Sequence, residues 1–274
     1  MSNHLKSTAD GMIALDVTPQ SAGWQYLSYR VVNLSAGQVY LHRTEGTELA
    51  LVPLTGAGYI ETAAGRFDMQ RAGVFIEKPS VLYLPPGQEF AVRSDSAFEF
   101  AFGAAPATGK YPTRLFKPEE MRSELRGGGA ARRQVNHILA HPLPAERLIL
   151  YEVYVPGGAW SGYPPHCHDG YLGSPVLDET YYFRTQPGNG VALHRNYRVD
   201  EDFDEIFAVR DRDLVLVTQG FHATSAAPGS NVYFLNYLAG ELLDEERATP
   251  PVDDPVYAWL KDDYTANLMQ LPVV

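Results

Sequence analysis

The sequence contains a single cysteine, Cys167, so no disulfide bond can form within the chain. This fits a reducing compartment. No apolar run approaches the roughly 20 residues that a membrane-spanning helix needs, and the first ten residues lack the basic-then-apolar profile of a signal peptide. These absences predict a soluble, cytoplasmic protein whose fold depends on its hydrophobic core.

Basic residues are outnumbered: 22 Lys and Arg against 33 Asp and Glu give a formal net charge of −11. This balance argues against non-specific binding to nucleic acid or to an anionic membrane surface. The sequence also lacks a helix-turn-helix pattern and a basic patch. If the substrate is itself an anion, its site must supply cations locally against the charge of the whole chain.

Long amphipathic helices are scarce, and short β-type runs separated by turn residues take their place. With 24 glycines, 20 prolines and 12% aromatic residues, the composition favours many short strands joined by tight turns. This pattern predicts an all-β protein of the sandwich or barrel class. Typical runs are SYRVVNL (28–34), ELALVPL (48–54), RLILYEVYV (147–155) and NVYFLNYLAG (231–240).

Three segments differ from this β pattern. Residues 1–24 are polar and irregular, which predicts an arm or a loose first strand. Residues 117–126, KPEEMRSELR, predict a short helix, and a second helix is expected from Asp254, which would cap it. The glycine run 127–129 predicts a flexible link, and a phosphate-binding loop is disfavoured because the P-loop Lys-Ser/Thr is missing. We therefore expect a domain of residues 1–125 and a domain of residues 126–274.

The segment 163–183, YPPHCHDGYLGSPVLDETYYF, contains the main candidate site. In an extended segment His166 and His168 point to the same face and Cys167 to the other. Glu179 would add an oxygen to these two nitrogens, and His222 is the best candidate for a fourth ligand. The alternative is a hydrogen-bonded polar cluster inside a barrel. Asp178 could replace Glu179, but strand alternation turns Asp178 towards solvent and Tyr181 and Phe183 towards the interior.

A degenerate internal repeat links the two halves of the chain. Residues 37–58 resemble residues 158–190 in order: a glycine turn, a strand, a loop, a Glu-led strand and another glycine turn. The first half offers only His42, with Glu89 or Phe90 where the last histidine of the second half stands. We therefore expect two similar barrels, of which only the second binds a metal.

Four stretches together resemble a bicupin, and specifically the 5-deoxyglucuronate isomerases of inositol catabolism. The resemblance implies two double-stranded β-helix (jelly-roll) barrels with a few short peripheral helices. It also implies His166, His168, Glu179 and His222 as ligands of one divalent metal. Glu179 follows His168 by eleven positions, which is longer than the generic cupin spacing, and Thr218 replaces the usual proline before the distal histidine. The four stretches are RGGGAARRQVNHIL, YEVYVPGGAWSGYPPHCHD, LDETYYFR and GFHATSAAPGSNVYFLNYLAG.

The resemblance implies an aldose-to-ketose isomerisation of 5-deoxyglucuronate, a sugar acid, to 5-keto-2-deoxygluconate. Zinc is the expected metal, with manganese, iron or nickel as alternatives. Arg195 could pair with the substrate carboxylate, and Tyr163 could contact sugar hydroxyls. Glu179 or Tyr181 could move the proton.

The roles of several other residues and the function class stay open. His137 and His194 are expected to be structural or to support the ligands, and Arg132 and Arg133 to belong to the interdomain surface. The competing functions are a 5-keto-4-deoxyuronate isomerase, a cupin dioxygenase with the same ligand types, and a non-catalytic sugar-binding bicupin. A homo-oligomer is possible, and no nucleic-acid or membrane partner is expected.

Overall fold

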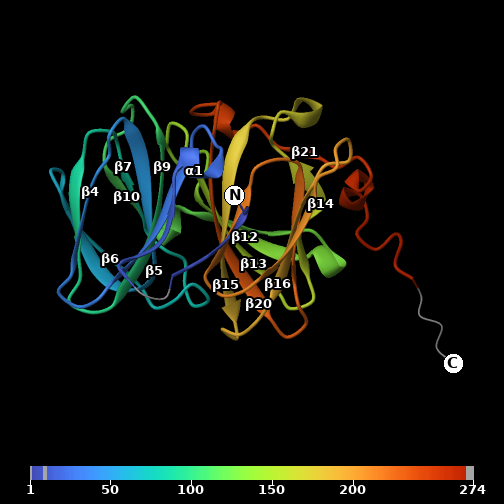
Figure 1. The fold of residues 1–274 in the computed structure, drawn as a ribbon, viewed down its shortest axis with the longest axis horizontal. Coiled ribbons are helices and arrows are strands. Elements are labelled where there is room, and N and C mark those ends of the chain that lie inside the picture. Colours follow the sequence, from blue (N-terminus) through green and yellow to red (C-terminus); the bar gives the residue numbers. More distant parts are fainter. Residues whose placement is uncertain (1, 9–10, 270–274) are drawn as a thin grey trace.

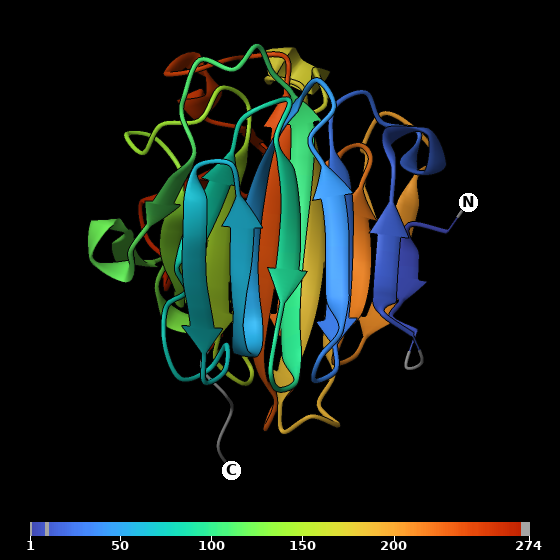
Figure 2. The same ribbon diagram turned by 90° about the vertical axis from the view of Figure 1, so that its left-hand side faces the viewer.

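The computed structural model describes residues 2–8 and 11–269, and the strands form two β-barrels side by side (Figure 1). The prediction of an all-β chain is confirmed, since 21 strands account for nearly all of the regular structure. Among the described residues no helix is long and apolar enough to cross a membrane. In Figure 2 the strands of the first barrel run alongside one another in front of those of the second.

The first barrel is a single curled nine-stranded sheet. Its strands are β2 (Ile13–Val17), β3 (Ser28–Leu34), β4 (Val39–Arg43), β5 (Thr47–Thr62), β6 (Gly65–Arg71), β7 (Val81–Leu84), β8 (Glu89–Arg93), β9 (Phe98–Pro106) and β10 (Arg114–Phe116).

The long strand β5 closes the first barrel because it bends within its own length. Its first part pairs with β7 and its last part with β6 and β8. The register against β9 shifts between Pro53 and Thr55, and Gly56 follows with φ +88°. A Cβ on Gly56 would lie 2.1 Å from the Ala97 carbonyl oxygen, so glycine is required at this bend.

The second barrel is made of two facing sheets. The seven-stranded sheet has the order β1-β18-β15-β20-β13-β12-β11, and the five-stranded sheet has the order β17-β16-β19-β14-β21. The strands of the first are β1 (His4–Lys6), β11 (Arg122–Arg126), β12 (Arg133–Leu139), β13 (Ile149–Val155), β15 (Leu177–Gln186), β18 (Asp213–Val217) and β20 (Asn231–Gly240). Those of the second are β14 (Trp160–Cys167), β16 (Ala192–Tyr197), β17 (Asp204–Val209), β19 (Phe221–Ala226) and β21 (Val252–Asp253).

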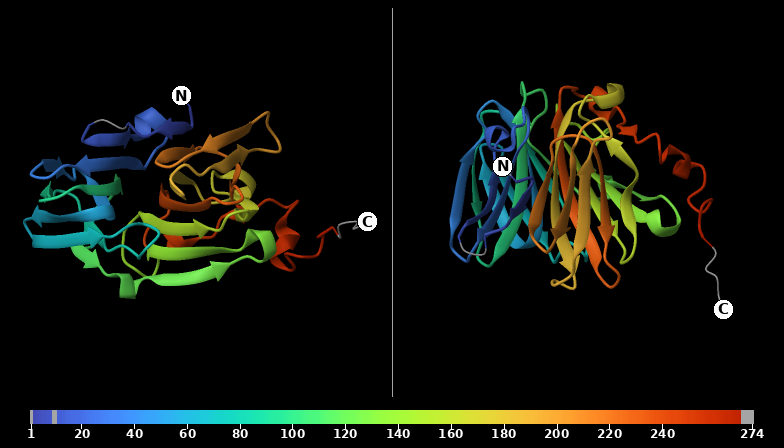
Figure 3. Two further views of the ribbon diagram at one scale, coloured as in Figure 1. Left: turned by 90° about the horizontal axis from the view of Figure 1, so that it is seen from below. Right: turned by 45° about the vertical axis from the view of Figure 1, so that its right-hand side comes forward.

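In the part of the chain that the structure describes, helical segments are limited to one turn of α-helix and five 3-10 turns. They are α1 (Pro19–Ala22), η1 (Pro118–Glu120), η2 (Gly129–Ala131), η3 (Tyr171–Gly173), η4 (Glu246–Ala248) and η5 (Ala258–Lys261). After η4 the chain runs along the outside of the second barrel, away from the first (Figure 3).

The predictions for the irregular segments were wrong in two places. Residues 117–126 form the short turn η1 and the strand β11 in place of a helix. The C-terminal helix is reduced to η5, and Asp254 is buried, where it accepts hydrogen bonds from Tyr197 Oη and the Val256 N–H. The N-terminal segment contains β1, β2 and α1, of which β1 pairs with β18.

The glycine run 127–129 is also not a link between barrels. Strand β11 pairs with β12, so the run is the turn of a hairpin within the second barrel. The change from one barrel to the other falls between β10 and β11. The division into two domains near residue 125 remains a proposal. Strand β1 is an exception to it, because β1 belongs to the N-terminal residues but pairs within the second barrel.

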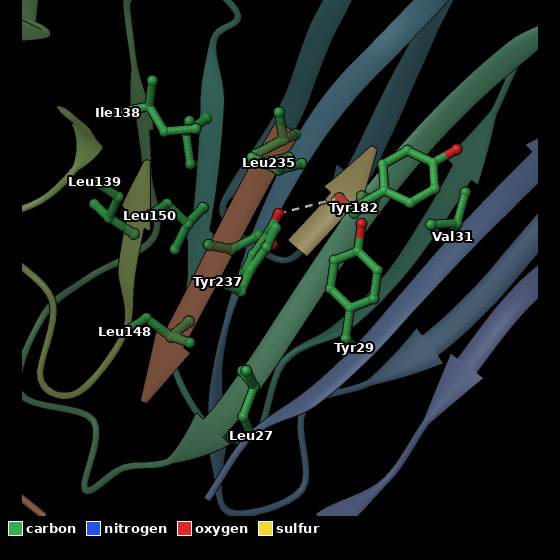
Figure 4. Packing of buried hydrophobic residues seen from close by; sticks show 14 of the residues in the cluster. Leu27, Tyr29, Val31, Ile138, Leu139, Leu148, Leu150, Tyr182, Leu235 and Tyr237 are labelled. Atoms are coloured by element: carbon green, nitrogen blue, oxygen red, sulfur yellow. Dashed lines mark hydrogen bonds between the residues drawn. The ribbon is translucent and has the colours of Figure 1, made fainter. Parts of the chain in front are cut away.

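The largest hydrophobic core lies between the barrels and not inside either of them. Five buried tyrosines from both halves belong to this core, together with leucines and valines, and the ring centroids of Tyr29 and Tyr237, both shown in Figure 4, are 5.3 Å apart. The Tyr237 hydroxyl donates to the Ala50 carbonyl of the first barrel at 3.1 Å. The two barrels are therefore packed as one body, and each also has its own interior cluster.

Candidate metal and substrate site

The candidate ligands come from both sheets of the second barrel. Strand β14 carries His166 at its end, with His168 directly after it, and the neighbouring strand β19 carries His222 as the cross-strand partner of His166. Glu179 lies on β15 in the facing sheet. The two sheets thus bring the imidazoles and the carboxylate together across the barrel interior. Cys167 points away from them into an apolar cluster with Tyr197 and Phe221, as predicted.

His168, Glu179 and His222 are buried, and one ligand atom from each lies within 4.8 Å of the others. Glu179 Oε2 is 2.8 Å from His168 Nε2 and 3.3 Å from His222 Nε2. The ring of His166 stands beside this group, with its centroid 4.5 Å from that of His222 and 6.3 Å from that of His168. Within the described residues this is the one cluster of three such side chains with metal-ligand spacing.

The hydrogen bonds of the cluster fit a cation among these side chains. His168 Nδ1 lies 3.0 Å from the Leu177 carbonyl oxygen, to which it donates, so Nε2 of the neutral ring presents a lone pair to the Glu179 carboxylate. Two acceptors at 2.8 Å need a shared cation or proton between them. Neither ring nitrogen of buried His222 has a hydrogen-bond partner among the described residues, which is costly unless a ligand fills the gap. Nitrogen and carboxylate donors together suit a divalent transition metal.

The pKa shifts of His166 and Glu179 point the same way, whereas burial lowers the pKa of His168 but the contact with Glu179 outweighs it and leaves that pKa raised. Burial, with the neighbouring His222 and His168, holds the pKa of His166 well below its ordinary value, so this ring is neutral near pH 7. Burial raises the pKa of Glu179, but the adjacent His168 and His222 rings outweigh it and leave that pKa well below its ordinary range. A neutral imidazole and an ionised carboxylate are the forms that bind metals.

A cavity of about 570 Å³ opens from this cluster. Tyr163 and Tyr181, predicted as substrate-binding and catalytic residues, both line it. Among the described residues, its walls hold five cationic side chains but only two carboxylates, those of Glu179 and Asp253. The local excess of cations is what an anionic substrate requires in a chain of net charge −11. The cations are Arg122, Arg126, Arg133, Arg247 and Lys261.

Arg195, predicted to bind the substrate carboxylate, lies outside this cavity. Its guanidinium donates to both carboxylate oxygens of Asp204, at 2.8 and 2.6 Å, and lies 4.0 Å from the centroid of the Tyr197 ring. Strand alternation explains the difference, because the neighbour His194 is fully buried and Arg195 therefore faces out of the barrel. Arg195 is thus already paired with a carboxylate of the protein, that of Asp204, and not with one from a substrate.

Two further residues were placed wrongly from the sequence. Asp178 does not face solvent: it is buried, and one of its oxygens accepts the backbone N–H groups of residues 25, 26 and 27. Arg133 does not belong to an interdomain surface, because it lines the cavity together with Val135 and His137 from the same face of β12. Strand alternation along β12 could have predicted this position, because Arg133, Val135 and His137 are two residues apart and therefore lie on the same face.

His194 and His137, expected to be structural or supporting, have their ring nitrogens engaged by protein groups. His194 contacts Thr224 and Asn196, and burial next to His222 lowers its pKa to about 3. His137 lines the cavity, and its Nε2 is 2.9 Å from Glu124. Tyr264 and Lys261, from the segment after η4, also line the cavity and carried no recognisable sequence signal.

Comparison with known proteins finds relatives that match most of the chain. A model of the KduI/IolB family matches residues 2–260. The 5-deoxy-glucuronate isomerase of Geobacillus kaustophilus is 37% identical over 255 residues, which cover 91% of each chain. That of Bacillus subtilis strain 168 is 31% identical over 251 residues, covering 89% of this chain and 91% of its own.

Solved structures agree on the fold. An IolB-like protein from Salmonella typhimurium superposes with a TM-score of 0.89 at 33% identity, covering 94% of this chain and 98% of that one. An oxalate decarboxylase from Lactobacillus farciminis superposes with a TM-score of 0.61 at 11% identity, covering 88% and 86%. The second likeness concerns the fold alone, and the predicted bicupin architecture is confirmed.

Proposed function

Because the chain belongs to the KduI/IolB family, we propose that it converts 5-deoxyglucuronate to 5-keto-2-deoxygluconate, an aldose-to-ketose isomerisation of inositol catabolism. The observation that carries this proposal is the cavity, which joins the His/Glu cluster to a wall with five cationic side chains. An open-chain uronate needs both: a polar site for its carbonyl end and cations for its carboxylate end. The curated relatives with this name extend over about nine-tenths of the chain.

We propose that His166, His168, Glu179 and His222 hold one divalent metal, for which zinc is the first candidate. When bound there, the metal would act as a Lewis acid towards negative charge that develops on the substrate oxygens. The buried histidine nitrogens without partners and the ionised Glu179 support this assignment.

The isomerisation also needs a proton to leave one carbon and return to the next, and two side chains are placed for this work. Burial, with Glu179 nearby, raises the pKa of Tyr181 well above its ordinary value, so its hydroxyl stays protonated and has a proton to donate. We assign it to donate a hydrogen bond to a substrate oxygen. Glu179 stays ionised and is the carboxylate of the cluster that can accept the carbon-bound proton. Tyr163, half-buried in the wall, is assigned to a sugar hydroxyl.

The test is turnover by metal-stripped protein reconstituted with zinc in the absence of oxygen, with 5-deoxyglucuronate as substrate. Proton transfer in heavy water places deuterium at the product carbon derived from the aldehyde. A product without deuterium at that carbon would indicate a hydride shift in place of proton transfer. The assignment as an isomerase would still stand. Dependence on oxygen would refute the proposed function. Faster turnover of a 5-keto-4-deoxyuronate than of 5-deoxyglucuronate would instead assign the chain as a 5-keto-4-deoxyuronate isomerase.

A further inference from the structure

Four of the five cations that line the cavity are already engaged by protein groups. Arg122 and Arg126 share the carboxylate of Glu124, at 2.6 and 2.5 Å. Lys261 pairs with Asp253. The remaining engaged cation is Arg247, which donates to backbone carbonyl oxygens of residues 143, 145, 148 and 244. These side chains have little capacity left for a substrate.

Arg133 is different, because within the described residues no carboxylate lies within ion-pair distance of it. Its Nη1 donates to the Ala131 carbonyl oxygen at 3.2 Å, whereas its Nε is buried without any partner. An arginine keeps its charge in proteins, so this is a partly buried cation without a counterion. Such a group costs free energy as long as it is unpaired, and an anion that enters the cavity would relieve the cost.

The surroundings of Arg133 hold its side chain against the glycine turn. A Cβ on Gly127 would lie 2.8 Å from Arg133 Nη1, and one on Gly128 would lie 3.2 Å from Tyr264 Cβ. The absence of side chains on this turn therefore makes room for both residues. Tyr264 in turn donates to the Tyr163 carbonyl oxygen across the cavity wall, at 3.3 Å. Nη1 is held by Ala131 and Nε has no partner among the described residues, so hydrogen-bonding capacity of the guanidinium is left unused by the protein.

We propose that Arg133 binds the carboxylate of the open-chain uronate and so sets which end of the sugar reaches the His/Glu cluster. This rests on the proposed function and names the residue that makes the site selective for a sugar acid. A guanidinium can offer two parallel N–H donors, the arrangement that pairs with a carboxylate through both oxygens, and Arg133 lines the cavity. His166 and Tyr181 line the same cavity, so acid and carbonyl ends bind at separate places within it.

The test compares Arg133→Gln with the matched control Arg132→Gln, since Arg132 is the exposed neighbour outside the cavity wall. The substrates are 5-deoxyglucuronate and 5-deoxyglucose, which has a primary alcohol in place of the carboxylate. We expect Arg133→Gln to lower kcat/KM for the acid by roughly 10- to 1,000-fold and for the alcohol by less than about threefold. Arg132→Gln should change neither. Equal losses on both substrates, or no loss on either, would overturn the proposal.

A second measurement does not depend on turnover. Calorimetric titration of the intact, metal-loaded protein with D-gluconate, an open-chain sugar acid, should show binding that D-sorbitol lacks and that Arg133→Gln abolishes. Gluconate binding that survives the substitution would overturn the role of Arg133. If the unaltered protein binds gluconate through Arg133 but does not turn over 5-deoxyglucuronate, the proposed reaction fails while the carboxylate site stands.

Stability separates binding from a structural role. Removing a cation that has no protein counterion should leave the thermal midpoint of Arg133→Gln at or above that of the unaltered chain. A lower midpoint with an unchanged preference for the acid would assign Arg133 to the fold and overturn the proposal. Arg133→Lys keeps the charge without the fork, and we expect it to recover part of the preference for the acid.

Discussion

Histidines of the two barrels have very different neighbours. His42 in the first barrel packs among aromatic rings, with centroids 5.5 Å from Phe90 and 5.1 Å from Phe102. His222 in the second barrel lies next to two further histidines and Glu179. The difference lies in the side chains around each ring, since both residues stand on strands of a similar barrel.

Metal content should therefore depend on His222 and not on His42. His222→Ala removes a nitrogen donor from the cluster, and we expect metal affinity to fall by well over about tenfold, the loss that even supporting residues can cause. His42→Ala is the control and should leave bound metal unchanged. Elemental analysis of both purified variants measures this directly. Equal losses in the two variants would contradict a site confined to the second barrel.

Arg195 gives a prediction opposite to the one from sequence. Its ion pair with Asp204 is exposed to solvent, and such pairs contribute about 0–1 kcal/mol. We expect Arg195→Gln to keep kcat/KM for 5-deoxyglucuronate within about threefold, because no contact in the cavity is lost. Steady-state kinetics beside Arg133→Gln checks this. A loss of tenfold or more would restore Arg195 as a substrate-binding residue.

At the scale of elements, strands were predictable and short helical segments were not. Apolar alternation and turn residues located strands such as β13 and β20 because both are buried within a sheet. Residues 122–126 have the composition of a helix, yet they pair with β12, and the ladder places Arg122 beside His137. Here a contact between segments overrode local propensity.

The candidate site likewise contains residues that the sequence predicted and residues that it did not. The spacing of His166, His168 and Glu179 was readable because strand alternation fixes which side chains share a face. Arg133 was missed because its role depends on the absence of a counterion, and a sequence does not show which carboxylates pair with which arginines. Arg195 was misplaced for the converse reason, since its partner Asp204 lies on the neighbouring strand.

The glycine turn between β11 and β12 allows a test of how an element shapes the cavity. Gly127 has φ +72°, and a Cβ there would meet the Ala131 carbonyl oxygen at 2.2 Å and Arg133 Nη1 at 2.8 Å. Gly127→Ala should therefore lower the free energy of unfolding by more than about 1 kcal/mol and also weaken turnover of the sugar acid. Urea unfolding and kcat/KM measure the two effects.

Gly37 is the matched control, because it has φ +78° but nothing within 4 Å of the position that a Cβ would occupy. Gly37→Ala should show the backbone cost of about 1 kcal/mol without any change in kcat/KM. If Gly127→Ala also leaves kcat/KM unchanged, the turn does not position Arg133.

Over the whole molecule, buried carboxylates tie the two halves of the chain together. Glu48 accepts the backbone N–H groups of residues 146–148, and Asp178 accepts those of residues 25–27. Glu146 accepts those of residues 108–110. In addition, Arg71 and Glu152 form a fully buried ion pair between the barrels, 2.7 Å apart. The barrels should therefore unfold together.

Glu146 makes this joint stability depend on pH. Burial raises the pKa of Glu146, but the donors of Thr108, Lys110 and Gly109 outweigh it and leave the pKa below its ordinary value. A depressed pKa in the folded state contributes stability above the unfolded value, about 4.3, and the contribution is lost as pH falls through the folded pKa. Glu146→Gln should destabilise the protein by about 1–3 kcal/mol at neutral pH and by less in acid.

Denaturant titrations at neutral pH and at about pH 3 measure this difference. Glu245→Gln is the control, since Glu245 is exposed and forms no ion pair among the described residues. A destabilisation by Glu146→Gln that is equal at both pH values would show that the charge of Glu146 is not what holds residues 108–110.

The pairing of β1 with β18 has a consequence for synthesis on the ribosome. His4 lies opposite Val215, so β1 leaves the exit tunnel more than 200 residues before the strand with which it pairs. Strands β2 to β10 can meanwhile complete the first barrel, because all of their partners lie within residues 13–116. The nascent chain thus carries an unpaired β1 beside a complete first barrel, and β1 is among the last strands to dock.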